Sequence, residues 1–266
     1  MPTKVWLRAS GVLALVMAVF LPIVFGLFSA SPAVKTMATG LLVSALIAGT
    51  LAAWLYLPDV DLPGRTFRRG PKNRPLVALT FDDGPNGEHT RVILDVLAKH
   101  RAKATFFCVG RFAEAEPELI RRMVAEGHVV ANHTDTHALL PRLSPAMVAT
   151  EIGRAQRKIR EAGAPTPTLF RAPKGFKHPA LPKLLRENGL TLVGWTVGVW
   201  DTDRPGADAI ASRARKRLKN GTILLLHDGL RGLDRSQTAD ALDLVLADCA
   251  ARGLTPVTIP ELMSAR

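Results

Sequence analysis

Short apolar runs alternate with longer amphipathic segments from residue 76 to residue 259 of this 266-residue chain. The runs favour strands, and the segments between them repeat apolar residues at helical spacing. Such an alternation predicts an α/β fold, either a largely parallel sheet covered by helices or a (β/α) barrel. Strands are expected within Leu76–Pro85, Lys103–Val109, His128–Ala131, Thr168–Arg171, Leu190–Val197, Thr222–Leu226 and Thr255–Ile259. Helices are expected at Glu88–His100, Pro117–Glu126, Pro145–Ala162, Pro179–Asn188, Asp208–Lys219 and Thr238–Arg252.

Reactive side chains follow several of these predicted strands where each strand ends. Because the carboxyl ends of parallel strands meet at one face, we expect these side chains to lie close together. A hydrophobic core requires no histidine or aspartate after each apolar run, so the pattern predicts a functional site at that face. The residues are Asp82 and Asp83 after the first run, His133 after the third, Arg171 after the fourth, Asp201 beyond the fifth and His227 after the sixth.

Two histidines and an aspartate in this set are typical metal donors. His133 and His137 are four positions apart, which lets both imidazoles bind one cation if the segment is helical or tightly turned. Asp82 and Asp83 repel each other, so a buried pair needs a cation, a proton or hydrogen-bond donors. A solvated Asp-Gly turn is the alternative. Two nitrogens and one carboxylate would leave positions open for water and substrate, as in catalytic metal sites.

The first 58 residues are much more apolar than the rest. No charged residue lies between Ala9 and Val34 or between Thr36 and Pro58, and each run exceeds the roughly 20 residues that cross a bilayer. We expect residues 1–58 to form a membrane anchor, a transmembrane helical hairpin with its turn near Ser29–Pro32. A cleaved signal peptide is the alternative for the first run. Residues 59–75 are expected to be a linker, and residues 76–266 the α/β domain.

Basic residues predict the orientation and the surroundings of the protein. Lys4 and Arg8 precede the hairpin and a cluster between Arg65 and Arg74 follows it, against the single Lys35 between the runs. The positive-inside rule therefore favours a cytoplasmic C-terminal domain on a bacterial inner membrane. The net charge of +12 suggests anionic lipid, nucleic acid or an acidic glycan as surroundings. With no nucleic-acid recognition motif in the sequence, we expect lipid and glycan contacts, and no nucleic-acid or protein partner.

Five segments together resemble the polysaccharide deacetylases of the NodB homology type, also called carbohydrate esterase family 4. In chain order they are TFDDG at Thr80–Gly84, HTDTH at His133–His137, RAPKG at Arg171–Gly175, WTVGVWDTD at Trp195–Asp203 and LLLHD at Leu224–Asp228. The resemblance covers residues 75–262 of the chain. It implies a distorted (β/α) barrel with fewer than eight regular strands. It also implies a metal-dependent hydrolase that removes N-acetyl groups from the amino sugars of a polysaccharide or glycan.

The resemblance implies a role for each residue of the reacting centre. Asp83, His133 and His137 would hold a divalent ion, with zinc as the first choice and cobalt or nickel as alternatives. Such an ion polarises the acetamide carbonyl and activates a water. Asp82 would be the general base that takes the water's proton, and His227 the general acid that protonates the departing amine.

Further residues would support this centre. Arg171 would pair with Asp82 and keep it ionised, while Asp201 would orient or tune His227. Leu225 would help to form the pocket for the acyl methyl group. These assignments also follow from the resemblance.

The chain departs from the family pattern at several positions. Lys174 stands where the third motif usually has an aromatic residue, although a backbone N–H near it would still add to the oxyanion site. In the fourth motif Gly198 replaces an acidic residue, and Thr202 stands where a tryptophan is common. Trp195 and Trp200 either line the sugar site or pack in the core.

Two other functions compete with polysaccharide deacetylation. The first is deacetylation or deformylation of a polyprenyl-phosphate-linked sugar or glycolipid at the inner membrane, which a cytoplasmic domain on a short tether favours. The second is a non-catalytic glycan-binding membrane protein built on the same barrel. The presence of every expected base, acid and metal-ligand position disfavours that second alternative.

Overall fold

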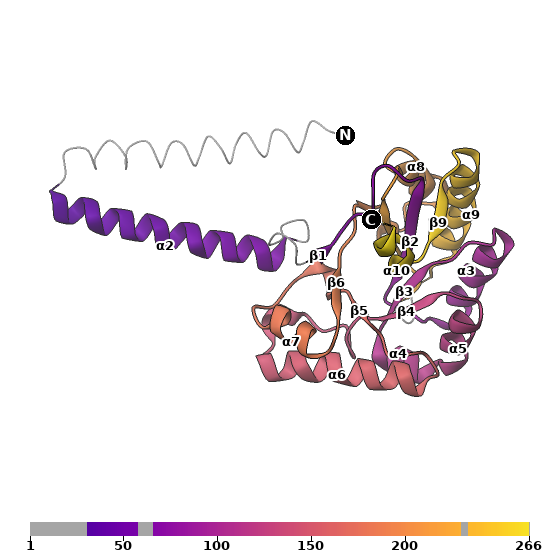
Figure 1. Ribbon diagram of the computed structural model, residues 1–266, viewed down its shortest axis with the longest axis horizontal. Coiled ribbons are helices and arrows are strands. Elements are labelled where there is room, and N and C mark those ends of the chain that lie inside the picture. Colours follow the sequence, from indigo (N-terminus) through magenta and orange to yellow (C-terminus); the bar gives the residue numbers. More distant parts are fainter. Residues whose placement is uncertain (1–30, 58–65, 230–233, 266) are drawn as a thin grey trace. The chain divides into compact units, whose positions relative to one another are not determined.

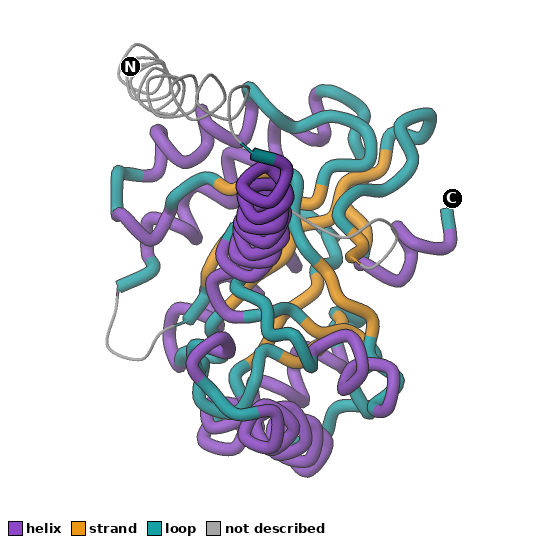
Figure 2. Tube along the Cα trace, turned by 90° about the vertical axis from the view of Figure 1, so that its left-hand side faces the viewer, coloured by secondary structure: helices purple, strands orange, loops and turns teal. Residues whose placement is uncertain are grey.

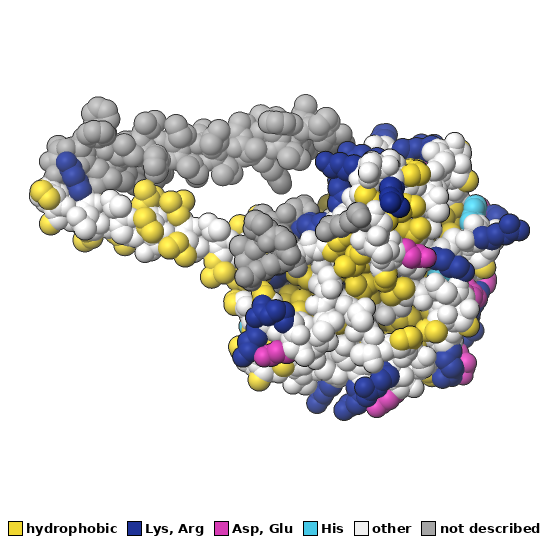
Figure 3. Space-filling model, viewed as in Figure 1, with side chains coloured by type: hydrophobic (Ala, Val, Ile, Leu, Met, Phe, Trp, Pro, Cys, Tyr) yellow, Lys and Arg dark blue, Asp and Glu magenta, His cyan; other side chains and the backbone are white. Residues whose placement is uncertain are grey.

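The computed structural model describes residues 31–57, 66–229 and 234–265. The chain divides into two compact units with their boundary between Ala53 and Trp54, and helix α2 (Pro32–Tyr56) crosses it. Among the described residues, α2 is the one helix long and apolar enough to cross a membrane. Its large apolar side chains are mostly exposed (Figure 3). The first helix of the expected hairpin lies, apart from its last residues, outside the described residues.

A single sheet occupies the centre of the second unit, with helices on its outside (Figures 1 and 2). All the strand pairs in the described part of the chain are parallel. The order across the sheet is β1-β6-β5-β4-β3-β2-β8-β7, and β9 also pairs with β2. The strands are β1 (Thr66–Phe67), β2 (Leu76–Asp82), β3 (Thr105–Cys108), β4 (Val129–Asn132), β5 (Leu169–Phe170), β6 (Thr191–Val193), β7 (Val197–Gly198), β8 (Ile223–His227) and β9 (Thr255–Val257).

The sheet curls into an incomplete barrel. Strands β6 and β7 lie near opposite ends of the strand order, yet only residues 194–196 separate them along the chain. Because three residues span little more than about 10 Å, the two ends of the sheet must approach each other. Strands β1, β5 and β7 are only two residues long, which agrees with the distorted barrel that the resemblance implies.

Amphipathic helices close the outer face of the sheet. Helix α3, for example, buries Ile93, Leu94 and Leu97 in the main core cluster, which also contains alternate residues of β2 such as Leu79 and Phe81. The helices are α3 (Gly87–Lys99), α4 (Gly110–Ala115), α5 (Pro117–Ala125), α6 (Pro145–Glu161), α7 (Leu181–Glu187), α8 (Ala207–Arg215), α9 (Ser236–Ala251) and α10 (Ile259–Ser264), with short 3-10 turns η1 (Leu140–Arg142), η2 (Pro173–Gly175) and η3 (Asp201–Asp203).

The structure differs from the sequence-based expectation at several places. Thr66 and Phe67, within the expected linker, form β1 and pair with β6. The expected strand Leu190–Val197 is divided into β6 and β7, because its first part pairs with β1 and β5 and its last residues pair with β8. Helices α4 and α10 were not expected, since six residues each are too few to show an apolar repeat.

Candidate active site

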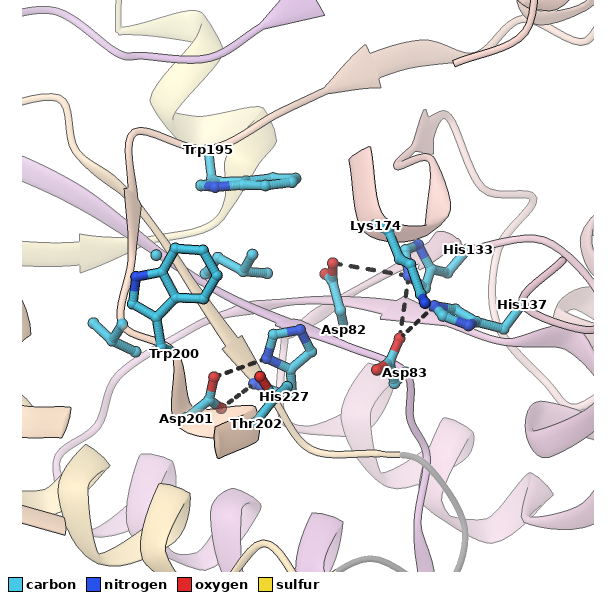
Figure 4. Close-up of a pocket in the computed structure, with 13 residues that line it drawn as sticks. Asp82, Asp83, His133, His137, Lys174, Trp195, Trp200, Asp201, Thr202 and His227 are labelled. Carbon is cyan, nitrogen blue, oxygen red and sulfur yellow. Dashed lines mark hydrogen bonds and ion pairs between the residues drawn. The ribbon is translucent and has the colours of Figure 1, made fainter. Parts of the chain in front are cut away.

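The carboxyl ends of β2, β4 and β8 surround a cavity of about 390 Å³ (Figure 4). Nine of the ten residues that the sequence analysis assigned to the site line this cavity, and the tenth, Arg171, is fully buried. The lining residues are Asp82, Asp83, His133, His137, Lys174, Trp195, Gly198, Val199, Trp200, Asp201, Thr202, Leu225 and His227.

Asp83, His133 and His137 converge at one side of the cavity. Asp83 Oδ1 lies 3.3 Å from His133 Nε2 and 3.0 Å from His137 Nε2. One ligand atom from each residue lies within 4.8 Å of the others. His133 Nδ1 is 2.8 Å from the carbonyl oxygen of Arg171. Because a carbonyl can only accept, Nδ1 carries a hydrogen and donates it there, so Nε2, which faces Asp83, is the nitrogen available to a metal ion.

This donor set fits a divalent ion. Two imidazole nitrogens and one carboxylate oxygen are a common ligand set of catalytic zinc sites, with further coordination positions left for water and substrate. Burial acts to raise the pKa of Asp83, but its hydrogen bonds to His133 and His137 hold the pKa well below the usual range. The aspartate is therefore an anion ready to bind a cation.

A tight turn brings the two histidines together. Thr134 and His137 have left-handed backbone conformations, with φ of 69° and 62°. The side-chain oxygen of Asn132 accepts from the Thr134 backbone N–H at 2.8 Å, and the Thr134 hydroxyl accepts from the His137 N–H at 3.1 Å. The spacing of the two histidines allowed either a helical or a tightly turned segment, and residues 133–137 form the tight turn.

Helix α6 holds this turn from outside through Glu151. One carboxylate oxygen of Glu151 accepts from the backbone N–H groups of Asp135 and Thr136, at 3.0 and 2.9 Å. The other oxygen accepts from the Thr136 hydroxyl at 2.9 Å. Lys158 on the same helix lies 3.1 Å from Asp135. The sequence analysis missed Glu151, because nothing in the spacing along a helix marks one glutamate among several.

Arg171 fixes Asp82 from behind the cavity. Its Nη1 lies 2.6 Å from Asp82 Oδ1 and 2.9 Å from the Thr80 hydroxyl. Its Nη2 donates to the Gly194 carbonyl at 3.0 Å, and its guanidinium carbon lies 4.0 Å from the centre of the Phe107 ring. The second oxygen of Asp82 is 3.8 Å from His133 Nε2. Asp82 is therefore anchored through one oxygen, while the other lies near the ligand set.

The partly buried His227 pairs with the buried Asp201, and Figure 4 shows this pair on the other side of Asp82 from the two metal-ligand histidines. Asp201 accepts from the His227 backbone N–H and lies near His227 Nδ1, both at 2.8 Å. The Thr238 hydroxyl donates to the same carboxylate at 3.1 Å. Burial acts to lower the pKa of His227, but the charge of Asp201 and its hydrogen bond raise it to about 9. The imidazole is a proton donor at neutral pH, and its Nε2 is free of the bond to Asp201.

The walls of the cavity differ in character. Leu225 on β8 is 9% exposed. Trp195 lines the cavity and also packs against a smaller core cluster that includes Phe67 and Phe107. Trp200 is 66% exposed, so core packing does not account for it. Lys174, in a left-handed conformation on η2, lies on the side of the two histidines (Figure 4).

Asp228 supports the turn that follows Asp83. Its Oδ2 accepts from the Thr90 hydroxyl at 2.7 Å, and the Thr90 oxygen accepts from the Asn86 backbone N–H at 2.8 Å. A Cβ at Gly84 would lie 2.1 Å from Asp228, so only glycine fits there. Burial and the nearby charge of Asp83 raise the pKa of Asp228 to about 7. The sequence analysis assigned no role to this residue.

Comparisons with known proteins identify the family of this chain. Residues 69–193 match the family model described as polysaccharide deacetylase. The chain is 43% identical over 196 residues to a chitooligosaccharide deacetylase of Bradyrhizobium sp. (strain ANU 289), an alignment that covers 70% of this chain and 90% of the relative.

Two solved structures are also similar. The peptidoglycan N-acetylglucosamine deacetylase Bc1960, in complex with 4-naphthalen-1-yl-N-oxidanyl-benzamide, has a TM-score of 0.73 and 31% identity, covering 76% of this chain and 94% of its own. A family 4 carbohydrate esterase from Streptomyces lividans, in complex with acetate, has a TM-score of 0.64 and 37% identity, covering 68% and 91%. Sequence and fold therefore agree, and this chain belongs to the polysaccharide deacetylase family.

Proposed function

We propose that the protein is a metal-dependent hydrolase that removes N-acetyl groups from the amino sugars of a glycan. The observation that carries this proposal is the convergence of Asp83, His133 and His137 in one cavity that Asp82 and His227 also line. The names of its relatives, a chitooligosaccharide deacetylase and a peptidoglycan N-acetylglucosamine deacetylase, support an N-acetylated glycan as substrate.

Asp83, His133 and His137 would hold the ion, with zinc as our first choice and cobalt or nickel as alternatives. When bound, the ion supplies Lewis-acid polarisation of the acyl carbonyl and lowers the pKa of a water. The donor set of two imidazoles and one carboxylate supports zinc in particular.

Asp82 and His227 move the protons of the reaction. Asp82 accepts a proton from water as the water oxygen forms a bond to the acyl carbon. The bond from that carbon to nitrogen then breaks, and His227 gives its Nε2 proton to the departing nitrogen. The products are acetate and a free amino sugar. Arg171 holds Asp82 in place through its contact at 2.6 Å, and Asp201 holds the protonated imidazole of His227 in place.

Leu225, Trp195 and Lys174 bind the substrate around the reacting bond. Leu225 and Trp195 give the cavity an apolar wall of a kind that suits the acyl methyl group. The backbone N–H near Lys174 would donate to the developing oxyanion.

The test uses the full chain, purified in mild detergent, on N-acetylated oligosaccharides and on lipid-linked N-acetyl sugars. We expect deacetylation that a chelator abolishes and that added Zn²⁺, Co²⁺ or Ni²⁺ restores. Asp82→Asn, which retains the three ligands, is the matched control and should stay inactive after the same additions. If the wild-type protein binds no divalent ion, the hydrolase proposal is wrong and a non-catalytic glycan-binding role replaces it.

We also propose that residues 1–58 form a two-span anchor in the bacterial inner membrane, joined to the catalytic domain by a linker that begins at residue 59. The length and apolar character of α2 support a membrane span, and the charge distribution around the two apolar runs favours a cytoplasmic domain. That orientation would favour the second candidate substrate, a lipid-linked amino sugar or glycolipid at the inner leaflet. A reporter fused to Arg266 tests this: an outward C-terminus rules out the inner-leaflet substrate and supports a wall or extracellular polysaccharide.

A further inference from the structure

Trp200 is the most exposed large apolar side chain among the described residues, at 66%. It lines the same cavity as the metal-ligand set and the predicted acid His227. An indole held in water adds little to the stability of the fold, since the hydrophobic gain comes from burial. Its position at the rim therefore requires another explanation.

The backbone at Trp200 is strained as well. Its φ of 56° and ψ of 39° lie in the left-handed region, which is unfavourable for a residue with a Cβ. This turn places the next residue, Asp201, against His227. Glycine or asparagine would satisfy the same turn with less strain, so the turn alone does not require an indole.

The two sides of the cavity have different chemistry (Figure 4). Lys174, His133 and His137 lie on one side, and both indoles lie with His227 and Asp201 on the other. In the proposed reaction His227 protonates the departing nitrogen, and this nitrogen is attached to the sugar ring. The sugar must therefore lie on the side of His227, where the indoles are.

Trp195 is partly buried and Trp200 is exposed, so the two indoles would contact different parts of the substrate. Leu225 and the partly buried Trp195 are placed for the acetylated unit, whose amide must reach His227 and the metal ligands. Trp200 lies at the rim of the cavity, where it would contact the part of the substrate that extends from the acetylated sugar into solvent. An indole face matches the C–H face of a pyranose, whose hydroxyl groups stay hydrated at its edges.

We infer that Trp200 is a platform for a neighbouring sugar ring, so that the substrate is an oligosaccharide or polysaccharide of at least two units. The inference rests on the proposed function and deepens it. It favours a glycan chain over a lipid-linked monosaccharide, which would place no second ring against Trp200.

The experiment measures KM and kcat of the full chain, in mild detergent with added Zn²⁺, for chitotetraose and for N-acetylglucosamine. We expect Trp200→Ala to raise KM for chitotetraose about tenfold, as expected for loss of one aromatic contact. KM for the monosaccharide should change less than about twofold, and Trp200→Phe should restore most of the affinity. The control is Met147→Ala, an exposed apolar residue outside the cavity, which should behave as wild type.

Two further measurements separate the possible failures. Calorimetry measures the affinity for chitotetraose, so it tests the role of Trp200 even if neither the wild type nor the variants hydrolyse the sugar. Weaker binding to Trp200→Ala than to the wild type supports the platform. Equal binding, or an equal loss of affinity for both sugars, overturns it. Absence of hydrolysis by the wild-type protein with every ion would instead overturn the proposed function. The melting temperature of Trp200→Ala should not fall, whereas a structural role for the indole would lower it.

Discussion

Glu151 on helix α6 accepts two hydrogen bonds from Thr136, one from its backbone N–H and one from its hydroxyl, each at 2.9 Å. Thr136 lies between the two predicted metal-ligand histidines, so the position of both imidazoles depends on a residue of the next α-helix along the chain. Partners that fix the orientation of metal ligands typically affect metal affinity strongly.

We predict that Glu151→Gln weakens zinc binding by about ten- to a hundredfold. An amide presents one acceptor oxygen and one donor nitrogen in place of two acceptors, so the bonds to the turn cannot all be kept. Competition with a chromophoric chelator measures the affinity. Glu161→Gln changes an exposed residue of the same helix and should leave it unchanged. Equal zinc affinity in both variants would contradict the role of Glu151.

The pair of Asp201 and His227 predicts a change in pH dependence. Asp201 raises the pKa of His227 to about 9, and a general acid must be protonated to act, so activity should persist up to that pH. Asp201→Asn removes the negative charge, the pKa of His227 falls, and the alkaline limb of the kcat profile should move to lower pH. Asp203→Asn, in the same short turn but exposed, is the control. An alkaline limb at the same pH in Asp201→Asn would show that His227 is not the acid.

Arg171 should contribute to stability as well as to the site. Arg171→Met leaves the buried carboxylate of Asp82 without its charged partner, and breaking a buried ion pair in this way typically costs about 3–5 kcal/mol. Urea unfolding of the full chain, followed by tryptophan fluorescence, measures the free energy of unfolding. Arg160→Met, at an exposed position of α6, should change it by less than about 0.5 kcal/mol. Similar stability of the two variants would refute this prediction.

Variants of Asp82 and His137 distinguish the loss of the general base from the loss of metal binding. Asp82→Asn should lower kcat by about 10²–10⁴-fold, because the base is lost, while zinc affinity changes little. His137→Ala removes a ligand and should abolish both zinc binding and hydrolysis. Circular dichroism should show that both variants remain folded. Full activity in either one would refute the scheme.

The alternation of apolar runs was sufficient to predict the helices and strands with strong periodic patterns, such as β2 and α6. A metal site at the turn His133–His137 could be predicted because imidazole side chains are themselves typical metal ligands, and the structure brings both histidines together with Asp83. The role of Glu151 could not be predicted, since it arises only when α6 packs beside that turn. The strand β1 was missed for a similar reason: two residues show no periodicity, and their pairing depends on β6.

The register between β2 and β8 makes Asp82 and His227 direct neighbours across two central strands. The spacing between these two residues is thus set by the ladder of main-chain bonds between the strands, at the roughly 4.8 Å that separates adjacent strands in any sheet. Loops around the rim can lengthen, shorten or change sequence without altering that spacing. A scaffold of this kind lets the loops, and the glycan contacts they make, change while the main-chain spacing between the proposed base and the proposed acid stays constant.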